Sequence, residues 1–162
     1  MTDDKNQFIL NDYQEEIPSE EALQLIGIRL GKELYGVLIE KIREIARLLQ
    51  ITTVPGTAPH IMGLMNLHGE IICVVDVKIL LKMGKSVVTE NSRVVVIKTI
   101  EGPVGIFCDG VTEIYDISKK DAEVCLSGLS IEKSGYINGQ VQTCNGLMGI
   151  LNVEELLFTR EK

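Results

Sequence analysis

The chain has 162 residues, enough for one domain or for two small subdomains that share a core. Hydrophobic residues make up 45% of the sequence, but aromatic residues make up only 4% and tryptophan is absent, so we expect an aliphatic core. The net charge is −7, yet most of it lies in residues 1–21, which hold seven acidic side chains and one lysine. The rest of the chain is nearly neutral and has no Lys/Arg cluster, so we predict no nucleic-acid partner.

Residues 1–21 are acidic and poor in hydrophobic side chains, and we expect them to form a mobile tail. The opening letters "MTDDKNQF" are acidic where a secretory signal would be basic. No apolar run in the chain is long enough to cross a bilayer, and the four cysteines follow no disulfide or zinc pattern. We therefore expect a cytoplasmic protein with reduced thiols and no direct membrane insertion.

The first predicted elements after the tail are a hydrophobic strand over residues 25–29, a turn at "LGKE" and a second strand from Tyr35. Residues 37–49 are ambiguous, because their apolar positions also have helical spacing. A similar stretch at 104–114 contains Gly110 and several β-branched residues, which disfavour a helix. We therefore predict a strand, a brief helical turn at "EKI" or "DGV", and another strand in each stretch.

The next segment, "GLMNLHGEIICVVDV", places His68, Cys73 and Asp76 within nine residues. On a strand, His68 and Cys73 point to opposite faces, and no C-x-x-C pair exists to complete a zinc site, so we predict no metal and no cofactor. "NLHG" instead predicts an exposed turn between two strands. Leu67 and Ile71 should point inward and His68 into solvent, with Asn66 and Gly69 accepting left-handed backbone angles.

A duplication becomes visible when the chain is shifted against itself. An offset of 69 residues places 25–29 on 94–98 and 35–45 on 104–114, and an offset of 76 then places 61–81 on 137–157. Each copy ends in a short leucine-rich helical turn, preceded by Asp76 in one copy and Asn152 in the other. Either side chain can cap that turn, whereas a shared catalytic role for Asp76 and Asp109 fails because their repeat partners are Asn152 and Glu40.

The segments "ELYGVLIEKIREI", "TTVPGTAPHIMG", "GLMNLHGEIICVVDVKILL", "GPVGIFCDGVTEI" and "LMGILNVEELL" resemble, in order and spacing, the CheW-like chemotaxis adaptor family. The third is similar to the family signature G-x-x-N-L-R-G-x-I-x-P-V-x-D-L, with His68 in the place of the arginine and Cys73 in the place of the proline. The resemblance spans roughly residues 22–158. It implies a mainly all-β fold of two pseudo-repeated, five-stranded SH3-like β-barrels that share a hydrophobic core. We expect one domain over 22–162, with the first repeat at about 22–90, the second at about 91–162, and exchange of strands between them possible.

The same resemblance implies a non-enzymatic scaffold, monomeric in isolation, that links the cytoplasmic tips of methyl-accepting chemoreceptors to the regulatory domain of a CheA-type histidine kinase. The kinase carries a homologous module, so the two proteins can pair through like surfaces of opposite barrels. Candidate partner-binding residues are Ile42, Glu44, Gly63, Asn66, His68 and Gly69. For some of these a structural role is the alternative: Ile42 in the core, Glu44 as a solvated charge, and Gly63 in a rigid connector with Val54, Pro55, Gly56 and Pro59.

Other functions stay open at this point. The output could be pilus motility or another non-flagellar pathway. A small-ligand-binding β-barrel would need a polar cluster inside a cavity, and an enzyme would need a nucleophile beside a base; the sequence favours neither.

Overall fold

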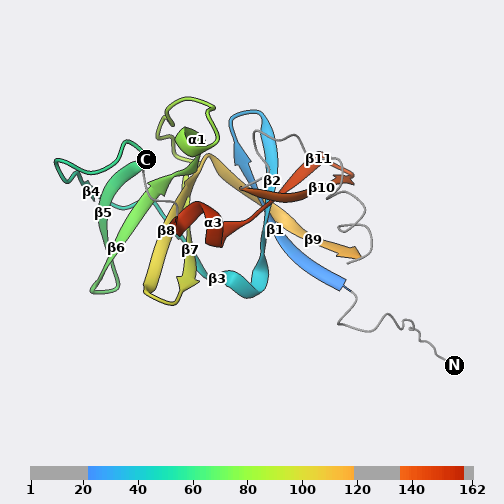
Figure 1. Cartoon of the computed structure of the whole chain (residues 1–162), viewed down its shortest axis with the longest axis horizontal. Helices are drawn as coiled ribbons and strands as arrows, with labels where there is room; N and C mark the ends of the chain where they lie inside the picture. Colours follow the sequence, from blue (N-terminus) through green and yellow to red (C-terminus); the bar gives the residue numbers. More distant parts are fainter. Residues whose placement is uncertain (1–21, 119–135, 159–162) are drawn as a thin grey trace, which may run out of the picture.

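The computed structural model describes residues 22–118 and 136–158, so the predicted acidic tail lies outside the described residues. Two β-sheets stand side by side along the long axis of the molecule (Figure 1). The five-stranded sheet has the order β10 (Ile137–Thr143), β11 (Gly146–Leu151), β2 (Glu33–Leu38), β1 (Ala22–Leu30), β9 (Gly110–Ser118). The six-stranded sheet has the order β3 (Ile42–Arg47), β7 (Arg93–Thr99), β8 (Gly102–Cys108), β6 (Glu70–Asp76), β5 (Ile61–Leu67), β4 (Ile51–Thr52).

Strand order in the two sheets follows the duplication. The two sequence offsets pair each strand of the first half with one of the second half: β1 with β7, β2 with β8, β3 with β9, β5 with β10 and β6 with β11. When every strand in the order of one sheet is replaced by its counterpart, the order of the other sheet results, except for the additional strand β4. The parallel pairs β2–β11 and β6–β8 are counterparts of each other as well. Each sheet therefore combines strands from both halves of the chain. The mainly β fold with two barrel-like sheets is confirmed, although the two-residue strand β4 makes one sheet six-stranded rather than five-stranded.

Residues 37–49 adopt the predicted strand, helical turn and strand. β2 ends at Leu38, a 3₁₀ turn (η3, Ile39–Lys41) follows, and β3 begins at Ile42. The helical turn predicted at "DGV" in the second half is wrong: β8 and β9 are separated by Asp109 alone, and Gly110 and Val111 already belong to β9. Both connections carry the chain from one sheet to the other.

The described residues form three hydrophobic clusters. One lies on the face of the five-stranded sheet that carries Leu25, Met148 and Ile150, and another on the face of the six-stranded sheet that carries Met65, Ile72 and Phe107. The largest joins both sheets and the two short helices, α1 (Val77–Leu80) and α3 (Val153–Phe158). Its buried members are Ile28, Leu30, Tyr35, Val37, Val75, Val77, Leu81, Val95, Ile97, Ile106, Cys108, Ile137, Leu151, Val153 and Leu156. This shared cluster is the common core that the sequence predicts.

The capping roles predicted for Asp76 and Asn152 are confirmed. The Asp76 carboxylate accepts a hydrogen bond from the backbone N–H of Lys78 at the start of α1, at 3.2 Å. The Asn152 side-chain oxygen accepts from the N–H of Glu155 at the start of α3, also at 3.2 Å. Asp76 does more than Asn152, because it is only 2% exposed and also accepts from the N–H and hydroxyl of Ser86 in the loop after α1.

Candidate partner-binding site

The "NLHG" stretch forms the turn between β5 and β6, and His68 reaches solvent as predicted, with 71% of its side chain exposed. Leu67 is buried, but Ile71 is 58% exposed, so the prediction that Ile71 points inward is wrong. The neighbours of Ile71 explain this difference, because Ile72 and Val74 fill the inner cluster and adjacent side chains on a strand point to opposite faces.

The backbone of the turn also differs from the prediction. His68 and Gly69 are the two central residues, with φ of 56° and 85°, as a type I′ hairpin requires. Asn66 belongs to β5 instead, and its side-chain oxygen accepts a hydrogen bond from the N–H of Gly69 at 3.0 Å. The left-handed position that we predicted for Asn66 is therefore occupied by His68.

β3 brings charged side chains against this turn. The His68 Nε2 lies 3.3 Å from Glu44 Oε1, and Arg43 donates to Glu70 Oε1 at 2.9 Å and to Glu44 Oε2 at 3.3 Å. We call the surface formed by Arg43, Glu44, His68 and Glu70 the His68 face. Two exposed isoleucines, Ile45 and Ile71, follow Glu44 and Glu70 in the chain.

The remaining candidates lie elsewhere. Ile42 is partly buried and packs against the shared core, the structural role that we gave as its alternative. Gly63 is buried within β5. The neighbouring strand β4 lies so close to it that an added Cβ would be 2.4 Å from the carbonyl oxygen of Thr52. The structure thus brings Glu44, Asn66, His68 and Gly69 together and separates Gly63 from them.

A second surface of the same construction lies on the turn between β10 and β11, toward the opposite end of the molecule (Figure 1). The Asn145 Nδ2 donates to Glu113 Oε2 at 2.6 Å and to the Tyr115 hydroxyl oxygen at 2.7 Å. Exposed Ile114 and Leu147 flank it, as Ile45 and Ile71 flank the first surface. We call the surface formed by Glu113, Tyr115 and Asn145 the Asn145 face.

Sequence reasoning missed the Asn145 face, although the duplication contains the signal for it. The offset of 69 residues maps Glu44 on Glu113 and Ile45 on Ile114. The offset of 76 maps Ile71 on Leu147, and it maps His68 on Cys144. Applying these offsets to the candidate residues predicts the second face directly.

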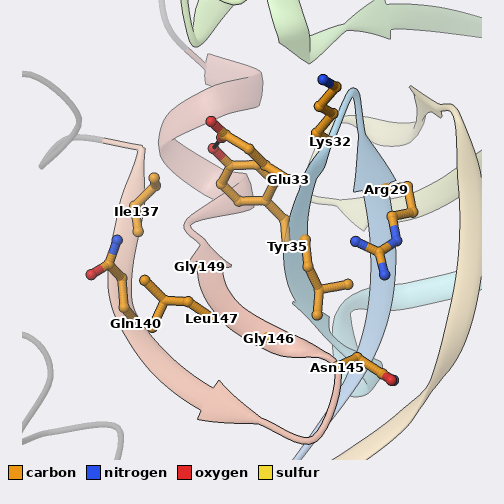
Figure 2. A pocket seen from close by; sticks show the side chains of 11 residues that line it. Arg29, Lys32, Glu33, Tyr35, Ile137, Gln140, Asn145, Gly146, Leu147 and Gly149 are labelled. Carbon is orange, nitrogen blue, oxygen red and sulfur yellow. Dashed lines mark hydrogen bonds between the residues drawn. The ribbon is translucent and has the colours of Figure 1, made fainter.

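A pocket of about 360 Å³ opens on the five-stranded sheet between β2 and the β10–β11 pair (Figure 2). Its floor is Tyr35, whose ring packs on Gly149 and whose hydroxyl donates to Glu33. Burial and this hydrogen bond raise the pKa of Tyr35, so its phenol stays neutral. Arg29 and Lys32 also line the pocket, and their positive charges are opposite in sign to the charge of Glu33. Leu34, Tyr35 and Ile137 of its lining also belong to the apolar clusters of the sheets.

Cys73, Cys108 and Asp109 have structural surroundings. Burial raises the pKa of Cys108 to about 12 and also raises that of Cys73, which keeps both thiols protonated and weakly nucleophilic. Asp109 accepts from Lys78 Nζ at 3.2 Å and from the N–H of Gly31 at 2.7 Å, so it ties α1 to the β1–β2 turn.

Within residues 22–118 and 136–158, no three His, Cys, Asp or Glu side chains are grouped so that they could hold a metal ion. In the same part of the chain, no helix is long and apolar enough to span a membrane.

Comparison with known proteins places these features in context. The family model described as CheW-like domain matches residues 24–161. The chain is 29% identical over 139 residues to the chemotaxis protein CheW of Helicobacter pylori, covering 86% of this chain and 84% of that protein. It is 25% identical over 127 residues to the chemotaxis protein CheW of Bacillus subtilis, covering 78% and 81%. The crystal structure of the scaffolding protein TtCheW from Thermoanaerobacter tengcongensis has a TM-score of 0.77 and 26% identity, covering 86% of this chain and 95% of that one.

Proposed function

This chain belongs to the CheW-like domain family, and from that membership we propose that it is a non-enzymatic adaptor in chemotaxis signalling. It couples the cytoplasmic tips of methyl-accepting chemoreceptors to the regulatory domain of a CheA-type histidine kinase. It acts in the cytoplasm and reaches the membrane through its partners. The curated relatives are named as chemotaxis proteins and the solved structure as a scaffolding protein, which supports this assignment.

The observation that carries the proposal is the pair of like faces toward opposite ends of the molecule. Each face has a hairpin turn, a glutamate that contacts the turn, and two exposed aliphatic side chains beside them. Exposed apolar side chains beside polar groups are typical of protein–protein interfaces. A scaffold needs two such surfaces because it must hold two partners at once.

The kinase module is the partner that we assign to the His68 face. Titration calorimetry of the chain with the isolated regulatory module of a CheA-type kinase tests this assignment. We expect saturable binding that Glu44→Lys and Ile71→Arg weaken, because both residues belong to or border the His68 face. Both side chains reach solvent, so the two substitutions should leave the core intact. Unaltered binding in both variants would contradict the assignment of this face, and no binding by the folded wild type would contradict the proposed function.

A second set of titrations separates the adaptor from a small-ligand-binding barrel. The pocket in Figure 2 is one candidate place for such a ligand. A panel of metabolites titrated into the chain should give no saturable heat, whereas saturation by one metabolite would favour the ligand-binding alternative.

A further inference from the structure

The turn between β10 and β11 carries the sequence Asn145-Gly146, in which an exposed asparagine side chain precedes a glycine. Thr143 closes this turn, because its hydroxyl oxygen accepts from the N–H of Asn145 at 3.1 Å and its hydroxyl donates to the carbonyl of Gly146 at 2.7 Å. Gly146 has a φ of 116°, and a Cβ added to it would meet nothing within 4 Å. The glycine side of the turn is therefore open.

An asparagine that is followed by glycine can lose its amide nitrogen without an enzyme. The backbone nitrogen of the glycine gives up its proton to solvent base and attacks the side-chain carbonyl carbon of the asparagine. The new C–N bond closes a succinimide ring, and the side-chain nitrogen takes up a proton and leaves as ammonia. Water then adds to one of the ring carbonyls and opens the ring to aspartate or to isoaspartate. Glycine permits the attack because it has no Cβ and reaches backbone angles that other residues resist.

Strand β9 holds the amide of Asn145 against this reaction. The Asn145 Nδ2 donates to Glu113 Oε2 at 2.6 Å and to the Tyr115 hydroxyl oxygen at 2.7 Å. A carboxylate can only accept hydrogen bonds, so the contact with Glu113 fixes which end of the amide faces β9. Departure of Nδ2 breaks both hydrogen bonds. Glu113 and Tyr115 thus raise the barrier to ring closure.

The turn between β7 and β8 has the same construction but no amide. The Thr99 hydroxyl oxygen accepts from the N–H of Glu101 at 3.2 Å, and its hydroxyl donates to the carbonyl of Gly102 at 2.5 Å. Gly102 has a φ of 120°, and a Cβ added to it would also meet nothing within 4 Å. Exposed Glu101 takes the place that Asn145 has in the other turn. The chain therefore offers a matched turn in which the same chemistry can be created.

The sequence contains one other Asn-Gly pair, Asn138-Gly139, and the fold places it differently. This pair lies inside β10, where Gly139 is buried and pairs with Ile150 of β11. Ring closure there would disrupt the pairing of two strands, whereas at the turn it disturbs only the tip of a hairpin. Asn145 is therefore the more reactive of the two asparagines.

We propose that Asn145 is a site of spontaneous deamidation, and that Glu113 and Tyr115 set its rate by holding the amide. The product carboxylate lies against the carboxylate of Glu113, so an attractive contact between the turn and β9 becomes a repulsion and the Asn145 face gains a negative charge. Isoaspartate also lengthens the main chain at the tip. The chemistry is independent of the proposed function; its consequence, a loss of binding at the Asn145 face as the protein ages, rests on it.

The test incubates the folded full chain at neutral and at mildly alkaline pH and digests samples over time. Mass spectrometry then quantifies aspartate and isoaspartate in the peptide of each asparagine. Tyr115→Phe removes one acceptor of the Asn145 amide and keeps the aromatic ring in the sheet. Glu101→Asn creates an Asn-Gly pair in the matched turn at an exposed position. Circular dichroism at the start of the incubation shows that each variant is folded.

We expect aspartate and isoaspartate to accumulate at Asn145 before any other asparagine, and faster at the higher pH because the attacking nitrogen must lose its proton. Tyr115→Phe should accelerate this conversion about two- to tenfold, the factor that corresponds to one hydrogen bond. In Glu101→Asn, position 101 should convert about tenfold or more faster than Asn145, since two hydrogen bonds, one of them to a carboxylate, restrain only Asn145.

Three results overturn the proposal. No conversion at Asn145, or earlier conversion at Asn138, removes the site. Aspartate without isoaspartate excludes attack by the Gly146 nitrogen, because only the succinimide opens to both products. Equal rates in the wild type and in folded Tyr115→Phe show that the hydrogen bonds of β9 do not control the reaction. None of these results depends on partner binding, so the proposed function is tested separately.

Discussion

Replacing the buried carboxylate of Asp76 should destabilise the fold more than any other change of a single polar side chain considered above. Asp76 is 2% exposed and accepts three hydrogen bonds: from the Lys78 N–H at 3.2 Å, the Ser86 N–H at 3.0 Å and the Ser86 hydroxyl at 2.8 Å. Asp76→Ala removes the cap of α1 and leaves these donors without their acceptor. Hydrogen bonds to a charged group contribute about 1.5 kcal/mol or more each, so we expect a loss of about 3–5 kcal/mol.

Two matched variants separate the components of this loss. Asn152→Ala removes a cap with a single hydrogen bond at the equivalent place before α3 and should cost about 1 kcal/mol. Asp76→Asn keeps the acceptor oxygen for Lys78 but turns an N–H₂ group toward the N–H of Ser86, so its cost should lie between those of the two alanine variants.

Urea unfolding followed by circular dichroism measures all three free energies of unfolding, and an unchanged slope with urea shows that the unfolded states are comparable. Hydrogen exchange at the Ser86 amide should accelerate in Asp76→Ala and stay unchanged in Asn152→Ala. If Asp76→Ala costs no more than Asn152→Ala, the carboxylate does not hold the loop after α1, and the reasoning is refuted.

Three further predictions concern the packing of the sheets. Gly63→Ala should cost about 2 kcal/mol or more in urea unfolding, because its φ is 146° and the new Cβ would collide with β4; a neutral effect would contradict this. A double-mutant cycle on Lys78 and Asp109, whose side chains are only 12% and 24% exposed, should give a coupling energy of about 1–2 kcal/mol, and a value near zero would mean that the pair does not link α1 to the β8–β9 connection. Alkylation at pH 8 followed by mass spectrometry should modify exposed Cys144 and spare Cys108, whose pKa is raised to about 12 by burial, and rapid native-state modification of Cys108 would refute this.

Much of the fold could be predicted because the duplication constrains it twice. Residues 37–49 alone fit a helix, but their counterpart contains Gly110, and a fold shared by both copies had to suit both sequences. The helix caps could be predicted for the same reason, since Asp76 and Asn152 hold equivalent positions before short leucine-rich turns. What the repeat could not indicate was which strands pair, because each sheet takes strands from both halves.

The details of the candidate site were harder to predict. In "EIICVVD" nearly every residue is apolar, so no alternation indicates which face each side chain occupies, and Ile71 was placed on the wrong one. The backbone angle of His68 depends on the register of the hairpin, in which Leu67 pairs with Glu70 and leaves His68 and Gly69 at the tip. The contact of His68 with Glu44 joins residues 24 apart in the chain, and β3 is not a neighbour of β5 or β6 in the sheet order, so strand pairing alone does not predict it.

In the proposed function, one chain holds a receptor and a kinase together through separate surfaces. The most direct measurement is a three-component sedimentation experiment with vesicles that display chemoreceptor cytoplasmic fragments, a CheA-type kinase, and increasing amounts of this chain. We expect the kinase to sediment with the vesicles in proportion to the chain added, and a folded Ile71→Arg variant to sediment while leaving the kinase in solution. Kinase that sediments equally without the chain, or a chain that stays in solution beside receptor vesicles, would contradict the account.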